Sequence, residues 1–485
     1  MKPAFLATLP ALALAACAAG PDYVAPVAPP AATAGFATAN PATVAAPADD
    51  RWWRMYEDPV LDGLVADALA ANTDVRVAVA RLDRARATLR EAKTDREPQA
   101  AIGAGGSYGR TAQIQSLPGL DRERATYDAG LDVRYEVDLA GRVRRNVEAA
   151  RGDVGAAAAD ADAVRVAIVA ATTRAYVDAA AAAERLAVAT RIVALLDRSA
   201  TLTMKRVEAG RAAKLDAVRI AALRDQRAAL VPAIAAERQA ALFRLATLTG
   251  RTPQDLPPQA AMRATTPRLA RPIPIGDGAA LLARRPDVRA AERRLAAATA
   301  RIGVATAELY PQISLGGSIG ATATGLSDIF TGGAFRWLLG PLLSWTVNQS
   351  AARARIAGAE ADMRGALATF DGSVLIALEE TETALSTYAR ELDRRARLQS
   401  ARDNAASAAR VTRARQREGQ IDFLEVLDAE RTFADADADL ASADARIAAT
   451  QVDLFRALGG GWQAAGGGAG DLSGSAGQNR SLAPT

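Results

Sequence analysis

The sequence contains no histidine and only one cysteine in 485 residues. Histidine is the commonest general base and a common metal ligand, so its absence removes the usual centre of catalytic and metal sites. No glycine-rich phosphate loop of the P-loop or dinucleotide type is present. Carboxylates are plentiful, but they lie among arginines at helical spacing, where solvated ion pairs are the usual state. The sequence therefore predicts a protein that is not an enzyme, with no catalytic residue, no cofactor and no metal.

Aromatic residues and net charge are also scarce. Aromatics make up 5% of the chain, and 59 basic residues against 55 acidic ones leave a formal charge of only +4. The sequence pI of about 9.3 reflects arginine being nearly the only base, because the basic residues are scattered rather than clustered. This distribution gives no support to nucleic-acid binding. Alanine dominates instead, so we expect a core made of thin, closely packed helices.

A stretch near the start of the chain is repeated without a gap in the second half. Residues 73–110 align with residues 286–323, which places Pro98 on Pro311. Such a match indicates an internal duplication. The matching residues other than alanine include Asp74, Val75, Arg76, Arg81, Leu82, Gln99 and Gly103 with Asp287, Val288, Arg289, Arg294, Leu295, Gln312 and Gly316.

Each copy begins with a helical pattern and then changes to a strand pattern. Apolar residues recur at spacings of three and four, and large ones alternate with alanine, as in a heptad seam. Proline cannot continue a helix and favours an extended residue before it, so Pro98 and Pro311 should end the helices. Strict alternation of polar and apolar or small residues after Pro311 predicts a strand. The seam residues are Val75, Ala78, Leu82, Ala85, Leu89 and Ala92, and Val288, Ala291, Leu295, Ala298, Ile302 and Ala305.

Four strands are predicted in all, at residues 100–110, 127–139, 312–323 and 335–347. In the second of these, seven apolar residues alternate with five charged residues and one glycine. This is the pattern of a membrane strand with one face on lipid and the other on water. A half-buried soluble strand alternates in the same way, but about 9 to 11 residues suffice to cross a bilayer. Four strands cannot close a barrel, and an open edge in lipid leaves backbone groups unpaired, so the chain should oligomerise.

Two long helical hairpins complete the pattern. No proline interrupts the chain between Gly141 and Pro232, which predicts a helix to about Gly210, roughly 100 Å long at 1.5 Å per residue. A second helix, about Lys214 to Leu248, should return. The later half copies this arrangement, with Gly419 and Gly459 in place of Gly210 and Gly250. Such rods also fit a structural coiled coil, but strands between the helices argue against a fibrous protein.

The first residues indicate the compartment. The apolar run from Ala4 to Ala16 follows Lys2 and is too short to span a bilayer, so it is predicted to be a secretory signal peptide. Residues 14–17 resemble the bacterial lipobox, in which cleavage leaves Cys17 as the first residue with a diacylglycerol on its thiol. Ala18 follows instead of the Asp that retains lipoproteins in the inner membrane, which favours the outer membrane.

These features together resemble one family. The lipobox, the residues Gly20 to Tyr23, the pair Trp52 and Trp53 before Asp58, and the duplication are similar to the TolC-like outer-membrane efflux factors, in the NodT-type lipoprotein branch. The resemblance covers essentially the whole mature chain. It implies an α+β membrane protein: a homotrimeric, 12-stranded outer-membrane β-barrel with four strands per chain, continued into the periplasm by a long α-helical coiled-coil barrel.

The resemblance also implies function and partners. The protein would be the passive exit duct of a tripartite efflux pump of the RND type, anchored by lipid in the bacterial outer membrane. A periplasmic adaptor protein and an inner-membrane pump would be its partners. The alternative is a periplasmic coiled-coil adaptor or tethering lipoprotein without a pore. An adaptor would have one hairpin flanked by compact β domains, whereas the helix-strand-strand-helix unit occurs twice here.

The segment from Gly419 to Arg431 resembles the family's stretch at the periplasmic tip. The resemblance implies that Leu424 and Asp428 form a constriction and that Arg431 takes part in the ionic contacts that close it. Leu215 and Arg219 occupy the matching places in the first repeat. Ordinary seam and surface residues are the alternative for this set. In place of the Phe-Asp-Gly-Gly-Arg type of turn after the fourth strand, this chain has Val347-Asn348-Gln349-Ser350-Ala351, so this junction departs from the family pattern.

The expected organisation follows from these boundaries. We expect a signal peptide at 1–16, a lipidated extended arm at 17–57, a first repeat at 58–250 and a proline-rich connector at 251–276. A second repeat at 277–462 and a disordered Gly/Ser/Ala tail at 463–485 complete the chain. Each repeat would contain a helix, two strands and two further helices.

The lipid anchor is directly testable. Substitution Cys17→Ser removes the thiol that would carry the diacylglycerol, so acyl labelling should be lost and an uncleaved precursor should accumulate. Metabolic labelling with a radioactive fatty acid, combined with the mobility of the protein on gels, measures both effects. Labelled mature protein in the variant would show that the lipobox interpretation is wrong.

Overall fold

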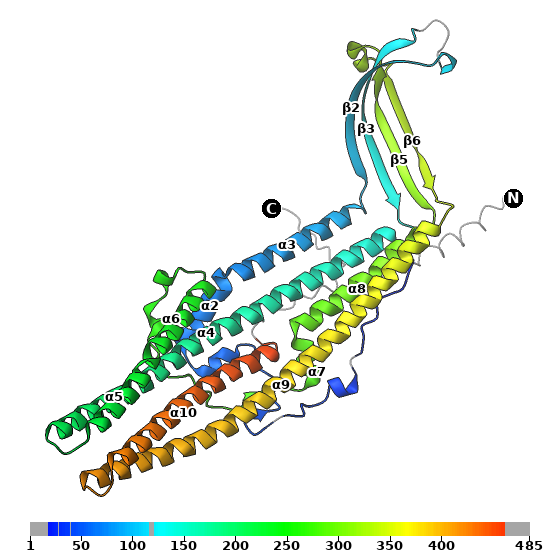
Figure 1. Cartoon of the computed structure of the whole chain (residues 1–485). Coiled ribbons are helices and arrows are strands. Elements are labelled where there is room, and N and C mark those ends of the chain that lie inside the picture. The colour runs from blue at the N-terminus through cyan, green and yellow to red at the C-terminus, as the bar shows by residue number, and fades with distance from the viewer. Residues whose placement is uncertain (1–17, 28, 39, 116–120, 461–485) are drawn as a thin grey trace, which may run out of the picture. The chain divides into compact units, whose positions relative to one another are not determined.

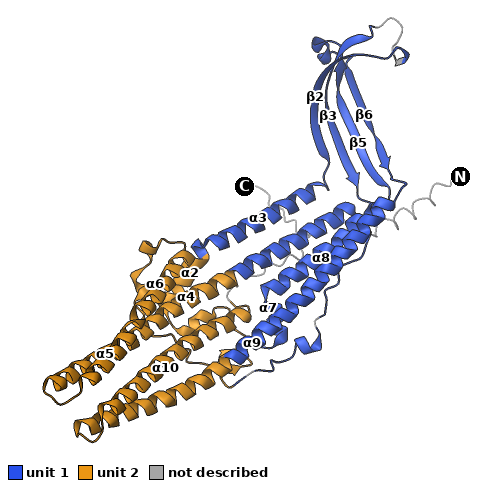
Figure 2. Cartoon of the chain, in the orientation of Figure 1, with its two compact units in different colours: residues 1–40, 70–164, 276–387 blue, residues 41–69, 165–275, 388–485 orange. Residues whose placement is uncertain are grey.

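The computed structural model describes residues 18–27, 29–38, 40–115 and 121–460. The chain divides into two compact units, each assembled from three segments (Figure 2). Unit 1 comprises residues 1–40, 70–164 and 276–387, and unit 2 comprises residues 41–69, 165–275 and 388–485. The two longest helices, α4 (Arg142–Glu208) and α9 (Ser350–Arg417), each contribute residues to both units.

Unit 1 contains a four-stranded antiparallel sheet (Figure 1). Its strands, in the spatial order β2-β3-β5-β6, are β2 (Gln99–Arg110), β3 (Glu123–Val137), β5 (Gln312–Ala323) and β6 (Phe335–Ser344). All four predicted strands are present, and β2 and β5 begin directly after Pro98 and Pro311.

β2 and β3 begin at Gln99 and Glu123, earlier than the predicted residues 100 and 127, and the C-terminal ends of β3 and β6 also differ from the prediction, each for a local reason. β3 ends at Val137 rather than Leu139, because the carboxylate of Asp138 accepts hydrogen bonds from the first backbone amides of α4. β6 ends at Ser344 rather than Val347, where the indole of Trp345 donates to the carbonyl of Leu309 instead of continuing the strand pattern. In both places a side-chain contact at the junction with a helix ends the strand.

The sheet has two chemically different faces. Leu131 pairs with Ile319, and Ile319 pairs with Trp337, so these side chains share one face across three strands. The neighbouring row on the opposite face contains Asp132, Ser318 and Leu338. Leu131, Ile319 and Trp337 are all exposed in the single chain. An exposed apolar face on a sheet indicates a surface that needs another apolar partner.

The duplication extends to the bounds of the elements. Helix α3 (Thr73–Thr94) and helix α8 (Pro286–Ala307) both have 22 residues, and β2 and β5 both have 12. Both pairs are related by the same offset that places Pro98 on Pro311. The residue match found in the sequence therefore corresponds to a repeated helix-to-strand unit.

Within unit 1, α4 and α8 approach each other closely. A Cβ added at Gly152 of α4 would lie 2.9 Å from the Cβ of Ala297, closer than carbon atoms tolerate. Two ion pairs flank this contact, Arg301 with Asp153 at 2.6 Å and Arg294 with Asp160 at 2.5 Å. Residue numbers rise on α8 as they fall on α4, so the two helices run antiparallel. Small residues make the contact and paired charges border it.

The N-terminal arm packs along unit 1. Its carbonyl at Ala32 would lie 2.2 Å from a Cβ at Gly278, and Ala32 itself belongs to a core cluster with Val288 and Phe370. Nearer the start, the hydroxyl of Tyr23 donates to Glu292 at 2.7 Å. The arm was expected to be extended, but its described residues include two 3-10 turns, η2 (Pro30–Ala32) and η3 (Trp52–Tyr56).

Unit 2 contains the ends of the helical hairpins. Its apolar cluster joins Val188, Ile192 and Leu196 of α4 to Ile220 and Leu223, with Ala434 and Ala441 from α10 (Phe423–Ala457). The predicted helix from Lys214 to Leu248 is wrong in one respect, because it is two helices, α5 (Lys214–Ala228) and α6 (Leu230–Leu248). Pro232 explains the break, since its ring has no N–H to offer and clashes with the preceding turn.

The remaining elements are short and mostly belong to the arm and the connector. A parallel pair of two-residue strands, Thr43–Val44 and Ile273–Pro274, joins these two segments within unit 2. The others are α2 (Pro59–Ala71), α7 (Gly278–Arg284), η3 (Trp52–Tyr56), η4 (Gln113–Gln115), η5 (Pro253–Asp255), η6 (Pro258–Ala261) and η7 (Leu326–Phe330).

The tryptophan pair noted in the sequence lies in the core of unit 2. Trp52 is fully buried and stacks on Phe455 of α10, with ring centroids 4.6 Å apart and planes 12° apart. Tyr56 donates to Gln451, which in turn donates to the hydroxyl of Tyr388, both at 3.3 Å. The motif that marks the family resemblance is thus a packing motif, which fixes the start of the folded chain against α9 and α10.

Asp58 ties three segments of unit 2 together. It is 7% exposed, and one carboxylate oxygen accepts from the hydroxyl of Tyr176 and from Arg263, both at 2.6 Å. The other oxygen accepts from the backbone amide of Val60 at the start of α2. Burial acts to raise the pKa of Asp58, but the hydrogen bonds from Tyr176, Arg263 and Val60 outweigh it and hold the pKa below the usual value.

Substitution Asp58→Ala should lower the free energy of unfolding by about 2 to 4 kcal/mol, because Tyr176 and Arg263 would lose a charged partner in a mostly buried site. Because the pKa is lower in the folded than in the unfolded state, this stabilisation is present above about pH 4 and is lost as the pH falls through the folded pKa. Denaturant unfolding of the detergent-purified protein at several pH values measures both effects.

The matched control is Asp67→Ala, which removes a carboxylate paired with Arg251 at 2.9 Å where both side chains are about a third exposed or more. This exposed pair should contribute about 1 kcal/mol or less. Equal destabilisation by the two substitutions would contradict the role assigned to Asp58.

Candidate functional site

Both helical hairpins turn in the same way in unit 2. Gly210 follows α4 and Gly419 follows α9, with φ of 69° and 71°, the left-handed region that favours glycine. The amide of the residue after each glycine donates to a helix carbonyl five residues earlier, Arg211 to Arg206 and Gln420 to Arg415. This is a Schellman motif. The glycines matched in the sequence therefore end equivalent helices with equivalent hydrogen bonds.

The residues predicted to form a gate lie just beyond these turns. Leu424, Asp428 and Arg431 recur at spacings of four and three along α10 and share one exposed face, with Leu424 53% exposed. Leu215 and Arg219 are likewise exposed on α5. The opposite faces of both helices are buried in the cluster around Ile192 and Leu196. Both repeats thus present a leucine and a charged residue outward at the predicted positions.

The ionic contacts expected of the gate are not formed between these residues in the single chain. Arg431 lies 4.0 Å from Asp435, one turn along its own helix. Among the residues that the structure describes, the carboxylate of Asp428 has no ion pair. The assignment of a gate to Leu424, Asp428, Arg431, Leu215 and Arg219 therefore remains a prediction that concerns contacts between copies of the chain.

A row of ion pairs behind this exposed face was not predicted; its carboxylates are largely buried, whereas its arginines are partly exposed. Glu430 is 2% exposed, and its carboxylate accepts hydrogen bonds from Nε and Nη2 of Arg413. Further along the same two helices, Arg402 donates to Asp437 at 3.0 Å. Asp444 accepts from both Arg395 and Arg268.

The row had a signal in the sequence. The three carboxylates Glu430, Asp437 and Asp444 follow one another at intervals of seven residues, which places them on the same side of α10. Carboxylates among arginines were interpreted as solvated pairs, because helical spacing alone does not show which face is buried. The arrangement joins α9 to α10 and leaves the predicted gate residues outside.

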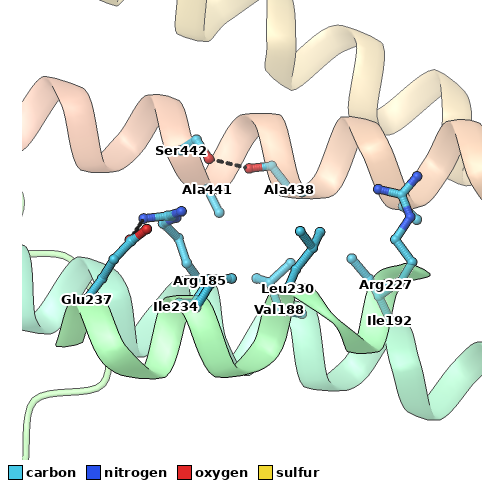
Figure 3. Close-up of a pocket in the computed structure, with 13 residues that line it drawn as sticks. Arg185, Val188, Ile192, Arg227, Leu230, Ile234, Glu237, Ala438, Ala441 and Ser442 are labelled. Carbon is cyan, nitrogen blue, oxygen red and sulfur yellow. Dashed lines mark hydrogen bonds and ion pairs between the residues drawn. The ribbon is translucent and has the colours of Figure 1, made fainter. Parts of the chain in front are cut away.

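A cavity of about 250 Å³ lies between α4, α6 and α10 (Figure 3). Its walls are mostly aliphatic, with Val188 and Ile192 on α4 and Leu230 and Ile234 on α6. Arg185 and Glu237 border it as an ion pair at 2.6 Å. On the same helix as Arg185, burial raises the pKa of Asp178, while its ion pair with Arg174 acts in the opposite direction. The cavity presents no nucleophile beside a general base.

The strands join the long helices through two different junctions. In the first, Asp138 caps α4 through Val143 and Arg144, and Gly141 takes a φ of 78°. In the second, Trp345 and Gln349 both donate to the carbonyl of Leu309, at 3.1 and 3.2 Å. Asn348 accepts from the amide of Ser350 at the start of α9. The segment that departs from the family pattern therefore forms a hydrogen-bonded junction of its own.

Cys17 lies outside the described residues, but the chain directly after it is fixed. The amide of Ala19 donates to the carbonyl of Ala140 at 2.9 Å, and Arg145 donates to Ala19 and to Asp22. These contacts place the start of the described arm against the junction between β3 and α4. Arg145 is almost fully buried, and its hydrogen bonds to Glu148 and Asp22 outweigh the effect of burial and raise its pKa.

Neither a metal centre nor a membrane-spanning helix is found in the described ranges. No group of three or more metal-binding side chains occurs among the residues from 18 to 460 that the structure describes. None of the helices described there combines the length and apolar character required to cross a membrane.

Comparisons with known proteins agree with this architecture. Residues 64–251 and 279–460 match the family described as Outer membrane efflux protein, so the family covers both repeats. The chain is 33% identical over 437 residues to the outer membrane protein OprJ of Pseudomonas aeruginosa, covering 89% of this chain and 90% of OprJ. It is 29% identical over 427 residues to nodulation protein T of Rhizobium leguminosarum bv. trifolii, covering 87% and 90%.

A solved structure gives the same result at the level of the fold. The outer-membrane channel OprN is 38% identical and superposes with a TM-score of 0.84, covering 92% of this chain and 100% of that one. The repeated helix-strand-strand-helix unit, the exposed apolar face of the sheet and these matches lead to one conclusion. The chain belongs to the outer membrane efflux protein family and is a TolC-like efflux channel of the outer membrane, without enzymatic activity.

Proposed function

We propose that three copies of this chain form a single duct, in which twelve strands make an outer-membrane barrel and the helices of both units continue it as a periplasmic tunnel. The observation that carries the proposal is the sheet of unit 1. It has an exposed apolar face, a polar face and, in the part that the structure describes, two unpaired edges at β2 and β6.

Association with other copies of the chain satisfies two requirements of this sheet: a partner strand for each edge, and a suitable surrounding for each face. Backbone groups at an edge have no water to bind inside a bilayer, so each edge needs another strand. Pairing β6 of one copy with β2 of the next supplies it, and repetition around an axis removes every edge. The apolar face then meets lipid, and the polar face encloses water. The strands, with 10 to 15 residues each, are long enough to cross a bilayer.

The chain itself would supply no energy for transport through the proposed duct. Its role is to conduct small molecules from periplasm to exterior, and an inner-membrane pump acting through a periplasmic adaptor would drive them. Relatives named as toluene efflux pump and pyoverdine export outer membrane proteins support this class of task. The choice of compound would lie with the pump, because a water-filled tunnel selects weakly.

The proposed anchor and the proposed gate lie at named places in the chain. Cys17 would carry the lipid two residues before Ala19, whose amide is hydrogen-bonded to the junction between β3 and α4. One lipid chain holds a protein only marginally, but several acyl chains on one residue hold it firmly. At the hairpin ends, Leu424 and Asp428 of three copies would meet on the axis, with Arg431, Leu215 and Arg219 beside them. Opening would follow when an adaptor binds the hairpin tips.

The membrane face can be tested by substitutions on adjacent residues of β3. Leu131→Arg would place a charge in hydrocarbon and should cost about 2 to 4 kcal/mol near the midplane, whereas Asp132→Arg would face water and cost little. The yield of heat-resistant trimer in the outer membrane measures the difference. Equal tolerance at the two positions would rule out the assignment of the apolar face to lipid.

Conductance tests the duct and the gate together. Purified protein should conduct ions in planar lipid bilayers, and Asp428→Ala combined with Arg431→Ala should raise the single-channel conductance without loss of trimer. An individual exposed ion pair stabilises the closed gate by about 1 kcal/mol or less. The expected effect on conductance therefore depends on three copies of the pair acting together.

The matched control for the gate is Arg390→Ala combined with Asp393→Ala, an exposed pair with the same spacing on α9. It should leave the conductance unchanged. A correctly assembled gate variant with wild-type conductance would place the constriction elsewhere, and wild-type protein that never conducts would refute the duct itself.

A further inference from the structure

Every second residue of the four strands faces the same side of the sheet as Asp128. This polar face begins with Gln99 on β2, Arg124 on β3, Gln312 on β5 and Arg336 on β6, as the strand register shows. If the proposed barrel is correct, this face lines its lumen, and the inference below rests on that proposal. The opposite face carries Tyr108, Leu131, Ile319 and Trp337, all of them exposed in the single chain.

Half of the residues on the polar face are glycine, alanine or serine. At one level of the sheet, Gly103, Gly130 and Gly320 are paired in a row across β2, β3 and β5. Gly320 is required there, because an added Cβ would lie 2.4 Å from the carbonyl oxygen of Ala129. The next residue in this row, on β6, is Arg336. The long side chain of Arg336 therefore lies beside a surface formed by glycines.

The side chain of Arg336 extends across this glycine surface, past β5, to β3. Its Nη2 donates to both carboxylate oxygens of Asp128, at 2.7 and 2.9 Å, although β5 lies between their two strands. Its Nε donates to the hydroxyl of Thr322 on β5 at 3.0 Å, and that hydroxyl donates to Asp128 at 2.7 Å. The position corresponding to a Cβ on Gly130 is 3.6 Å from Nη2, so the guanidinium lies on the glycine surface.

These charges remain accessible from the polar side. The side chain of Arg336 is 42% exposed and that of Asp128 is 47% exposed. Arg336 is the second residue of β6, and Asp128 lies in the corresponding part of β3, so the cluster is near the end of the sheet remote from α4 and α9 (Figure 1). In a barrel this end is the outer mouth.

The formal charge of the polar face is balanced. Its arginines equal its carboxylates in number within the four strands, and β2 and β5 contribute no charge to it. Glu136 is already paired with Arg142 of α4 at 2.7 Å. The charged residues are Arg124, Arg134, Arg336, Asp128, Asp132 and Glu136.

We propose that the Arg336–Asp128–Thr322 cluster sets the charge balance of the outer mouth, so that this end of the channel favours neither cations nor anions. Rings of charged side chains influence the ionic preference of pores, and three copies of the cluster would form such a ring. Because each arginine is held against a carboxylate on a surface of glycines, the ring is electrically neutral. Cationic and anionic compounds can then leave the barrel with similar ease, which suits a duct whose cargo is chosen by the pump.

The test is the reversal potential of the purified full-length trimer in planar bilayers under a KCl gradient. Arg336→Gln leaves Asp128 unbalanced and should shift the reversal potential toward K⁺ preference. Asp128→Asn leaves Arg336 unbalanced and should shift it toward Cl⁻ preference. The double variant Arg336→Gln with Asp128→Asn should return it close to the wild-type value.

A charge exchange separates selectivity from a purely structural role. Arg336→Asp combined with Asp128→Arg restores a pair at the same place and should also restore wild-type selectivity, while Arg336→Lys keeps the charge and should change little. Heat resistance of the trimer is measured for every variant. Opposite shifts in the two single variants support the proposal.

Two results would overturn it. Variants that conduct with unchanged reversal potential would show that the cluster does not act on ions. Variants that only lower the heat resistance of the trimer would show that the cluster merely joins β6 to β3. A wild-type protein without conductance is a separate result, because it refutes the channel rather than the role of Arg336.

Discussion

Close approach of helix backbones, which alanine and glycine permit, is the constraint on which both units depend. In unit 1 the contact between Gly152 and Ala297 leaves no room for even one further carbon atom. In unit 2, Ala434 and Ala441 of α10 belong to the same apolar cluster as Val188 and Ile192 of α4. Small side chains bury little apolar area at each contact, so each contributes little stabilisation by itself. Long helices with many such contacts are the consequence, and they explain a chain with few aromatic residues.

Ion pairs supply the specificity that small side chains lack. Alanine-rich surfaces slide past each other easily, because one alanine replaces the next without a clash. Arg301 and Arg294 oppose Asp153 and Asp160 along α8 and α4, and each pair is formed in only one register. In unit 2 the buried carboxylate of Glu430 on α10 pairs with Arg413, whose side chain is 36% exposed. Separating this pair would leave an uncompensated buried charge, so we interpret it as helping to set the register of α9 and α10.

The sheet uses the same small residues for a different purpose. Between helices, glycine allows two backbones to meet, whereas on the polar face of the sheet it leaves the surface flat and open. Gly130 and Gly320 give Arg336 a path across β5 to Asp128. Most of the large apolar side chains lie on the other face, including Trp337 and Leu339, although Leu338 and Leu342 of β6 lie on the polar face. The division of size between the two faces is what allows one short sheet to face hydrocarbon on one side and the proposed water-filled lumen on the other.

The sequence by itself determined the repeated unit and the character of its parts. Local backbone preferences follow from neighbouring residues and can therefore be inferred from the sequence. They account for the alignment of Pro98 with Pro311, the alternation along β3 and the glycines at 210 and 419. Tertiary structure alone decided which polar residues are buried. Asp58 meets Tyr176 and Arg263, and Glu430 meets Arg413, across separations that no spacing reveals. The break before α6 was readable from Pro232, but the partners of Arg336 were not. A side chain that crosses a strand to reach its partner depends on the register of three strands at once, and register is fixed only when the sheet has formed.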